Sequence, residues 1–251
     1  MSIDTARYQA DGYLCVPAVF SSTEVAALAA EADRLAGLSA LIHSNNLRCR
    51  WADHVETGEC RFDCFDPVTD LSPVIAEATR NPALLALLEA IYGEPARLFK
   101  DKLIYKPPGA PGYDLHQDWL AWDGFPQSFV TVIVAIDAAT AEAGATEVYP
   151  GLHKAGCLSP ADGEFHRLKP EQVASVAPVP LLLAPGDVAV FSGHLPHRSG
   201  ANRSAHSRRL LYLSYNAASD GGDLRESHYQ QFQAWLRGKY AQFGRHGVYF
   251  D

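Results

Sequence analysis

Three segments carry apolar residues at the spacing that is typical of amphipathic helices. Residues 25–38 follow Ser21, and Glu24 stands three residues after that serine, as in a capping box. Residues 83–92 follow an Asn-Pro pair, a good helix start, and stop before a glycine, a common helix end. A third helix is predicted over about residues 224–240.

Between the second and third helices the pattern changes to short apolar runs bounded by proline and glycine. The run 129–136 is rich in β-branched residues, which predicts a buried central strand. A turn and a short strand are expected within residues 8–20, whereas residues 39–70 show no regular pattern. The other predicted strands share the alternating or apolar pattern and comprise residues 98–105, 116–119, 146–149, 180–184, 188–191 and 209–215.

Many short strands flanked by helices favour one fold class. The pattern predicts a mainly β fold with flanking helices, built on a double-stranded β-helix, the cupin-like jelly roll. No internal repeat, low-complexity tract or linker interrupts the chain, so residues 1–251 are expected to form a single domain. A chain of this length with 47% hydrophobic residues can bury a sizeable core.

Charge and cysteine content narrow the partners and the compartment. A net charge of -8 argues against nucleic acid and against an anionic membrane surface. Five cysteines are an odd number and do not indicate a disulfide framework. The first residues lack the charge and apolar core of a signal peptide, and no apolar run approaches 18 residues. A cytoplasmic protein is therefore expected, with no prediction of its oligomeric state.

The candidate chemistry begins at the centre of the chain, in the sequence His-Gln-Asp. Side chains alternate along a strand, so His116 and Asp118 would point to the same side. A third metal ligand must come from elsewhere, and His194 and His197 both follow a predicted strand about eighty residues later. Two histidines and one carboxylate leave coordination positions open and suit Fe(II), whereas zinc more often takes four protein ligands. Spacing alone does not choose between His194 and His197.

Several segments together resemble the phytanoyl-CoA dioxygenase family of Fe(II)/2-oxoglutarate-dependent oxygenases. The resemblance covers nearly the whole chain and rests on five stretches, residues 11–13, 113–118, 143–154, 185–191 and 197–208. In that family an arginine that binds the far carboxylate of 2-oxoglutarate stands eleven residues after the second histidine. Counting from His197 reaches Arg208, whereas counting from His194 reaches Ala205, so the resemblance selects His197 and Arg208 together.

The resemblance implies the cofactors and the reaction class. Fe(II) would be held by His116, Asp118 and His197, with 2-oxoglutarate and O2 as co-substrates and with succinate and CO2 as products. Asp118 is present, whereas halogenating relatives carry a small residue there, so hydroxylation is expected. The other candidate contacts of 2-oxoglutarate are Ser199, Thr131 and Lys102, each of which could equally be an ordinary strand or surface residue.

The substrate is expected to be a small polar metabolite. Arg48 and Arg50 have strand spacing, which fits either a solvated edge strand or two cations presented to an anionic substrate. A compound like 2-aminoethylphosphonate would suit them. The other predicted substrate contacts lie near the metal motif and comprise Gln117, Trp119 and Tyr105.

Three alternatives remain at this stage. A hydroxylase of an acyl-CoA or another apolar molecule would need an apolar groove and a basic rim. A metal-binding barrel without catalysis would not turn over 2-oxoglutarate. A zinc hydrolase on the same fold would be active with Zn(II) in place of Fe(II).

Overall fold

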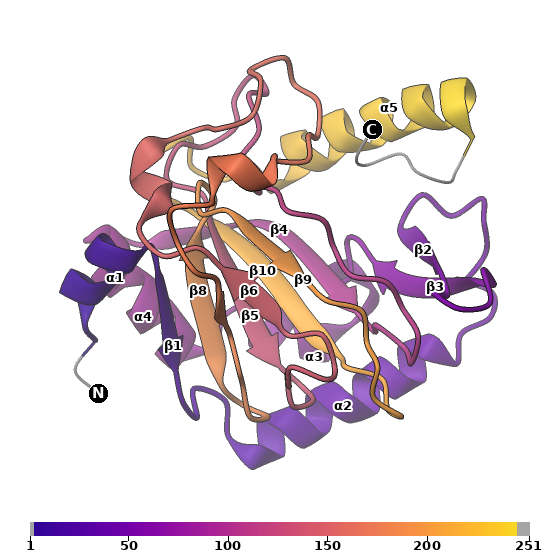
Figure 1. The fold of residues 1–251 in the computed structure, drawn as a ribbon. Helices are drawn as coiled ribbons and strands as arrows, with labels where there is room; N and C mark the ends of the chain where they lie inside the picture. The colour runs from indigo at the N-terminus through magenta and orange to yellow at the C-terminus, as the bar shows by residue number, and fades with distance from the viewer. Residues whose placement is uncertain (1–2, 245–251) are drawn as a thin grey trace.

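The computed structural model describes residues 3–244 (Figure 1). Its α-helices are α1 Thr5–Asp11, α2 Ser22–Ala36, α3 Pro73–Ala78, α4 Pro82–Tyr92 and α5 Arg225–Phe243. Its 3-10 helices are η1 Thr69–Leu71, η2 Leu152–Ala155 and η3 Pro170–Gln172. Its strands are β1 Tyr13–Val16, β2 Cys49–Asp53, β3 Cys60–Phe65, β4 Ala96–Ile104, β5 Val130–Ala135, β6 Thr146–Val148, β7 Val179–Pro180, β8 Val188–Ser192, β9 His197–Ser199 and β10 Leu210–Ala217.

The strands form two antiparallel sheets. The larger sheet has the order β1-β8-β5-β10-β4-β3-β2, and the smaller one has the order β7-β6-β9. One cluster of buried side chains joins the sheets and includes Val148 of β6, Ile133 of β5 and Phe191 of β8. Two facing antiparallel sheets with these crossovers form the predicted jelly-roll core.

The outer face of the large sheet is covered by helices. Val132 and Val134 of β5 belong to a second core cluster, which also contains Leu28 of α2 and Leu84 of α4. Figure 1 shows α2 running beneath the strands. Because side chains alternate along a strand, Thr131 and Ile133 point to the other face. That inner face carries the functional side chains.

The two predicted helix starts are confirmed. Ser21 accepts a hydrogen bond from the Glu24 amide, and the Glu24 carboxylate accepts one from the Ser21 amide. Asn81 caps α4 by accepting from two backbone amides. Gly93 ends α4 with φ of 75°, a conformation that glycine adopts without steric cost.

Some predicted elements were wrong. Residues 39–70, expected to be irregular, contain the β2–β3 hairpin and η1, because their polar side chains obscure the strand pattern. The strand predicted over 116–119 is reduced to one bridge between His116 and His197. The strand predicted over 180–184 is replaced by β7, Val179–Pro180, and a bridge from Ala139 to Leu183. No helix among residues 3–244 is long and apolar enough to cross a membrane.

Candidate metal centre

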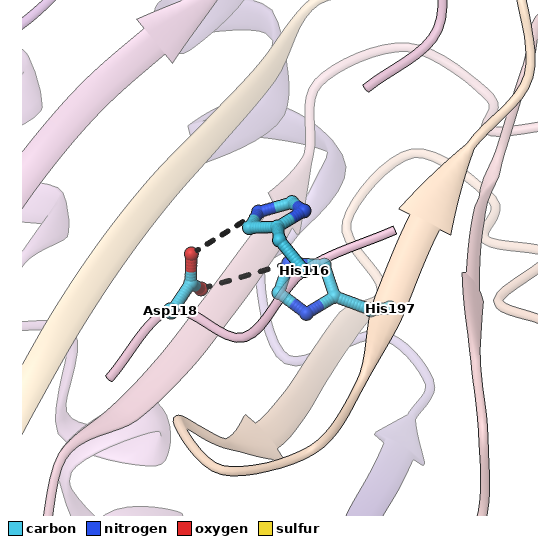
Figure 2. A group of neighbouring side chains, drawn as sticks. All are labelled: His116, Asp118 and His197. Atoms are coloured by element: carbon cyan, nitrogen blue, oxygen red, sulfur yellow. Dashed lines mark ion pairs between the residues drawn. The ribbon is translucent and has the colours of Figure 1, made fainter. Parts of the chain in front are cut away.

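His116, Asp118 and His197 lie together at the inner face of the jelly roll (Figure 2). His116 and His197 are directly opposite each other in an antiparallel bridge, and each amide donates to the other residue's carbonyl, at 3.0 and 2.9 Å. Asp118 follows two residues after His116, so its side chain reaches the same side. The backbone pairing therefore fixes the two imidazoles relative to each other before any metal binds.

The ligand atoms are close enough to share one cation. His116 Nε2 lies 3.6 Å from Asp118 Oδ1, and His197 Nε2 lies 3.8 Å from Asp118 Oδ2. All the candidate ligand atoms lie within 4.8 Å of one another. Figure 2 shows both rings turned toward the carboxylate, leaving a space among the three groups.

Hydrogen bonds at the far side of each ring fix its orientation. His116 Nδ1 lies 2.6 Å from the Asp114 carbonyl, and His197 Nδ1 lies 3.0 Å from the Leu195 carbonyl. A carbonyl only accepts, so each Nδ1 carries a proton, and each Nε2 is the ring nitrogen that faces Asp118. Two imidazole nitrogens and a carboxylate that converge on one space are the donor set of a bound cation.

Charge at the centre matches the states that a metal requires. Burial opposes ionisation of Asp118, but His197, the contact with His116 and the Lys102 ammonium hold the pKa of this carboxyl well below 3.8. Burial, reinforced by His116, lowers the pKa of His197 to about 4. A carboxylate and a neutral imidazole at neutral pH bind a metal without first losing a proton.

Thr131 and His194 also lie near the three ligands, and only Thr131 contacts one of them. Thr131 Oγ1 donates to Asp118 Oδ2 at 2.5 Å, so its only proton orients a metal ligand. Thr131 therefore has no proton for 2-oxoglutarate, the contact that the sequence suggested. His194 stacks on Trp119 with ring centroids 5.0 Å apart and does not belong to the cluster.

A cavity of about 340 Å³ opens beside His116 and Asp118. Its floor is a row of residues across three paired strands, with Thr131 of β5 opposite Ser214 of β10 and Ser214 opposite Lys100 of β4. Its apolar wall consists of Trp51, Leu120, Phe125, Phe129, Phe165 and Tyr240. The metal ligands thus stand at one end of a floor that turns polar and then cationic.

Besides Arg167, which pairs with Asp114, three cationic side chains line this cavity: Arg50, Lys100 and Lys102. Lys100 Nζ lies 3.3 Å from Asp66 Oδ2, and Arg50 Nη2 lies 3.8 Å from the same oxygen. Burial raises the pKa of Asp66, but Lys100 and Arg50 outweigh it and the net shift is downward. Asp66 is therefore a carboxylate that neutralises one of the three positive charges.

Lys102 differs from Lys100 in having no ion-pair partner among residues 3–244 within contact distance. Its Nζ lies 5.1 Å from the centre of the Tyr212 ring. Burial lowers its pKa, but Asp118 and Asp66 more than compensate, so the net shift is upward. The cavity therefore holds a charged lysine that faces the metal ligand without contacting it.

Arg208 is buried behind the metal centre and has unused hydrogen-bond donors. One nitrogen donates to the Gly144 carbonyl, whereas Nε and Nη2 have no partner among the residues that the structure describes. An arginine side chain that is only 1% exposed strongly favours an anionic partner. The far carboxylate of 2-oxoglutarate, which accepts two parallel hydrogen bonds, fits these two nitrogens.

The other predicted site residues lie elsewhere. Arg48 makes a bidentate pair with Asp70, at 2.6 and 2.8 Å, and does not line the cavity. The remaining three make structural hydrogen bonds outside the cavity wall: Gln117 to the Leu158 amide, Trp119 to the Pro126 carbonyl and Tyr105 to the Ala32 carbonyl. None of these four residues lines the cavity, so their assignment to the substrate stays a prediction without support from this geometry, because spacing along the chain does not show which way a side chain faces.

Sequence reasoning also missed residues that do line the cavity. Lys100, Ser214, Asp66 and His228 come from four separate parts of the chain, namely β4, β10, the end of β3 and α5. Only Lys100 left a usable signal, because it shares the strand spacing of Lys102 on β4 and must face the same side. Asp66 and His228 reach the cavity through long-range packing.

The comparison with known families agrees with this geometry. Residues 8–210 match the family described as phytanoyl-CoA dioxygenase (PhyH). This chain belongs to the phytanoyl-CoA dioxygenase family. Iron, 2-oxoglutarate and O2 are accordingly its cofactor and co-substrates, and the chain is a 2-oxoglutarate-dependent oxygenase.

Two curated relatives of this family member carry names that specify a phosphonate. A methylphosphonate hydroxylase of Gimesia maris is 42% identical over 141 residues, which cover 56% of this chain and about half, 52%, of that protein. A 2-aminoethylphosphonate dioxygenase of the uncultured bacterium HF130_AEPn_1 is 34% identical over 181 residues, which cover 68% of this chain and 67% of that protein.

Solved structures show the same fold. The epimerase SnoN in complex with Fe3+, alpha ketoglutarate and nogalamycin RO is 26% identical, with a TM-score of 0.70 over 85% of this chain and 82% of that one. EctD from S. alaskensis with 2-oxoglutarate and 5-hydroxyectoine reaches a TM-score of 0.70 at 23% identity, over 87% and 78% of the two chains. At that identity the second structure supports the fold alone.

Proposed function

We propose that this oxygenase hydroxylates a C–H bond of a small organophosphonate, with 2-oxoglutarate and O2 as co-substrates and succinate and CO2 as products. The observation that carries the proposal is the cationic part of the cavity floor, Arg50, Lys100 and Lys102, next to the metal ligands. A 2-aminoethylphosphonate-like compound remains the reference substrate, and methylphosphonate is its smallest analogue.

The charge balance of the cavity favours an anion. Of the carboxylates along its wall, Asp114 pairs with Arg167 at 3.2 Å, and Asp63 faces Lys106 and Arg208 behind the metal centre while accepting a hydrogen bond from Tyr113 at 2.6 Å. Asp118 belongs to the metal. Asp66 alone therefore faces three cations, and a phosphonate carrying one or two negative charges would complete the neutralisation.

The distance from metal to cations favours a compact substrate. Thr131, Ser214 and Lys100 occupy one row on three adjacent strands. Neighbouring strands are about 4.8 Å apart, so the anion site lies within roughly 10 Å of β5, whose Thr131 donates a hydrogen bond to Asp118. A cavity of about 340 Å³ with a charged floor fits a C–H bond one or two bonds from phosphorus. A long acyl-CoA does not fit this volume.

The relatives support the same class of substrate. Methylphosphonate, 2-aminoethylphosphonate and, in a relative from Stutzerimonas stutzeri that is 26% identical, hypophosphite appear in their names. Each compound has a tetrahedral phosphorus with anionic oxygens. A cationic floor suits the feature that these substrates share rather than the groups that differ.

Different residues of the chain bind the metal and the substrate. Bound iron(II) supplies oxygen activation coupled to the decarboxylation of 2-oxoglutarate. His116, Asp118 and His197 hold the metal, and Thr131 orients Asp118. Lys100, Lys102 and Arg50 fix the anionic end of the substrate, so the attached C–H bond is held toward the metal. The aromatic wall excludes water from the reacting carbon.

A substrate screen tests the proposal. Iron-loaded protein would be given methylphosphonate, ethylphosphonate, 2-aminoethylphosphonate, ectoine and a short acyl-CoA, with succinate formation as the readout and His116→Ala as the blank. We expect substrate-dependent succinate only with phosphonates. Turnover of the acyl-CoA or ectoine alone would overturn the proposal.

A matched pair of variants tests the role of the floor. Lys100→Met should raise the KM for the phosphonate by about 10- to 100-fold, because hydrogen bonds to charged groups contribute about 1.5–3 kcal/mol. Arg48→Met removes a cation that does not line the cavity and should leave this KM unchanged. Equal effects of the two variants would contradict the assignment.

A further inference from the structure

A buried lysine lies behind the metal centre, next to Arg208. Lys106 follows β4, and its side chain is 0% exposed. Its ammonium donates to three oxygens, Gly144 O at 3.2 Å, Ser199 Oγ at 2.9 Å and Gly200 O at 2.5 Å. All three ammonium protons are therefore used, which is the arrangement of a lysine held in one position.

Lys106 and Arg208 meet at one carbonyl oxygen. Arg208 also donates to Gly144 O, and the Lys106 carbonyl accepts from the Arg208 amide at 3.2 Å. Gly144 has φ of 69°, and a Cβ there would lie 2.3 Å from Gly200 O. The chain thus brings a backbone carbonyl between two cations at a position that only glycine can occupy.

The Ser199 hydroxyl accepts two hydrogen bonds, so its proton remains available for donation. Ser199 Oγ accepts from Lys106 Nζ and from the Tyr113 amide at 3.1 Å. A hydroxyl has two acceptor sites and one donor, so both acceptor sites are occupied here. Lys106 therefore orients the Ser199 proton away from itself, and no acceptor for it lies among residues 3–244.

The charges around Lys106 leave one positive charge in surplus. Arg208 and Lys106 are the cations, and Asp63 is the facing carboxylate, with the Tyr113 hydroxyl donating to it. The Tyr113 ring centre is 5.9 Å from Lys106 Nζ, and the other facing groups are the Ser199 hydroxyl and two carbonyls. Two cations against one carboxylate, 2 − 1, give a net charge of +1 in a buried space, which a second carboxylate would neutralise.

We propose that Lys106 is a positioning residue of the 2-oxoglutarate site, which orients the Ser199 hydroxyl and adds a second positive charge for the far carboxylate of the co-substrate. The inference rests on the placement of that carboxylate at Arg208. It gives Ser199 and Lys106 a joint role, in which Arg208 supplies the bidentate pair and Ser199 supplies one further hydrogen bond.

The same geometry predicts that co-substrate binding is coupled to a proton. Burial, with Arg208 adding to it, lowers the pKa of Lys106 to about 7. A bound carboxylate favours the ammonium and raises this pKa, so binding above pH 7 takes up a proton at Lys106. The affinity for 2-oxoglutarate should therefore fall as pH rises from 7 to 9.

Anaerobic calorimetry on the iron(II)-loaded protein tests the proposal. Each protein would be titrated with 2-oxoglutarate and with 2-oxobutyrate, a 2-oxo acid without the far carboxylate. Lys106→Met should lower the affinity for 2-oxoglutarate about tenfold or more and leave that for 2-oxobutyrate unchanged. Lys154→Met, at an exposed position, is the control and should match the wild type.

Proton uptake provides a second measurement that needs no variant. Titrations of the wild type at pH 8 in two buffers of different ionisation enthalpy should show uptake of up to one proton with 2-oxoglutarate and less with 2-oxobutyrate. Equal uptake with both ligands would overturn the proposal even where Lys106→Met does not fold. So would unchanged 2-oxoglutarate affinity in a folded Lys106→Met protein.

Arg208→Met separates the two levels of the argument. If Arg208→Met binds 2-oxoglutarate as the wild type does, the placement of the far carboxylate is wrong and the role of Lys106 falls with it. If Arg208→Met loses affinity and Lys106→Met does not, only the role of Lys106 is wrong. Neither outcome bears on which phosphonate is the substrate.

Discussion

The metal ligands and the cationic floor border the same cavity, but different kinds of structure hold them. His116 and His197 face each other across a backbone bridge, and each ring has a second hydrogen bond to a carbonyl. The cations of the floor come from β2 and β4, and the Phe232 ring of α5 lies 4.3 Å from Lys100 Nζ. Backbone pairing thus sets the metal centre, whereas packing between distant elements sets the floor.

This difference separates the reaction from its substrate. Changes at the metal end should affect turnover of every substrate, because every substrate depends on the same bound metal. Changes at the floor should affect which substrate is bound and leave the metal in place. The same separation allows family members to share iron chemistry while acting on different compounds.

The largest effect is expected at the metal end. Asp118→Ala removes the only carboxylate ligand, and turnover should fall by more than the roughly 100-fold that loss of an outer hydrogen-bond partner costs. Bound iron, measured by atomic absorption after dialysis, should fall in parallel. Full iron content with no turnover would mean that Asp118 does not hold the metal.

The next effect is expected at the co-substrate. Arg208→Lys keeps the charge but loses the planar pair of donors, so the KM for 2-oxoglutarate should rise about 30-fold, equivalent to roughly 2 kcal/mol. The KM for the phosphonate should stay within a factor of about three, since Arg208 does not line the substrate cavity. If only the KM for the phosphonate rises, Arg208 belongs to the substrate site and not to the 2-oxoglutarate site.

Acid should destabilise the α5 side of the cavity. Burial, reinforced by Lys100, lowers the pKa of His228 to about 3. Between pH 6.5 and about 3 the unfolded state binds the proton and the folded state does not. The free energy of unfolding therefore decreases by roughly 1.4 kcal/mol for each unit by which the pH is lowered. His228→Phe should reduce this slope in urea unfolding of the metal-free protein, and His206→Gln, at an exposed position, should not.

The smallest effect is expected from Thr131→Val, which keeps the side-chain shape and removes the hydrogen bond to Asp118. Iron affinity should fall about tenfold, the lower end of the range for an outer hydrogen-bond partner. Competition with a chelator measures it. If the KM for 2-oxoglutarate rises and iron affinity is unchanged, then Thr131 contacts the co-substrate, as its sequence position first suggested.

The same contrast explains what the sequence could predict. Helix caps are local patterns, and local strand spacing linked His116 to Asp118. These two features depend on backbone rules that act over a few residues. The jelly-roll core followed from the order of strands and turns, and the pairing of His197 with Arg208 came from the family resemblance.

The floor could not be predicted in this way. Arg48 and Arg50 stand two residues apart, so strand alternation predicts that they face the same side. In the structure Arg48 pairs with Asp70, whereas Arg50, next to a bulge between Arg50 and Trp51, lines the cavity. Asp66 and His228 stand more than 160 residues apart and reach one cavity only after α5 packs against β4. The direction of a side chain in a polar hairpin depends on contacts with residues that are distant in the sequence, and the local pattern does not predict these contacts.

The central claim is that a phosphonate binds on the cationic floor close to the iron. Phosphorus-31 relaxation of methylphosphonate, measured anaerobically with the iron(II) protein and with a zinc-substituted control, tests it directly. We predict strong paramagnetic relaxation in the iron protein, giving a metal–phosphorus distance below about 10 Å, and its loss in Lys100→Met/Lys102→Met. Relaxation that persists in the double variant, or binding without any paramagnetic effect, would contradict the claim.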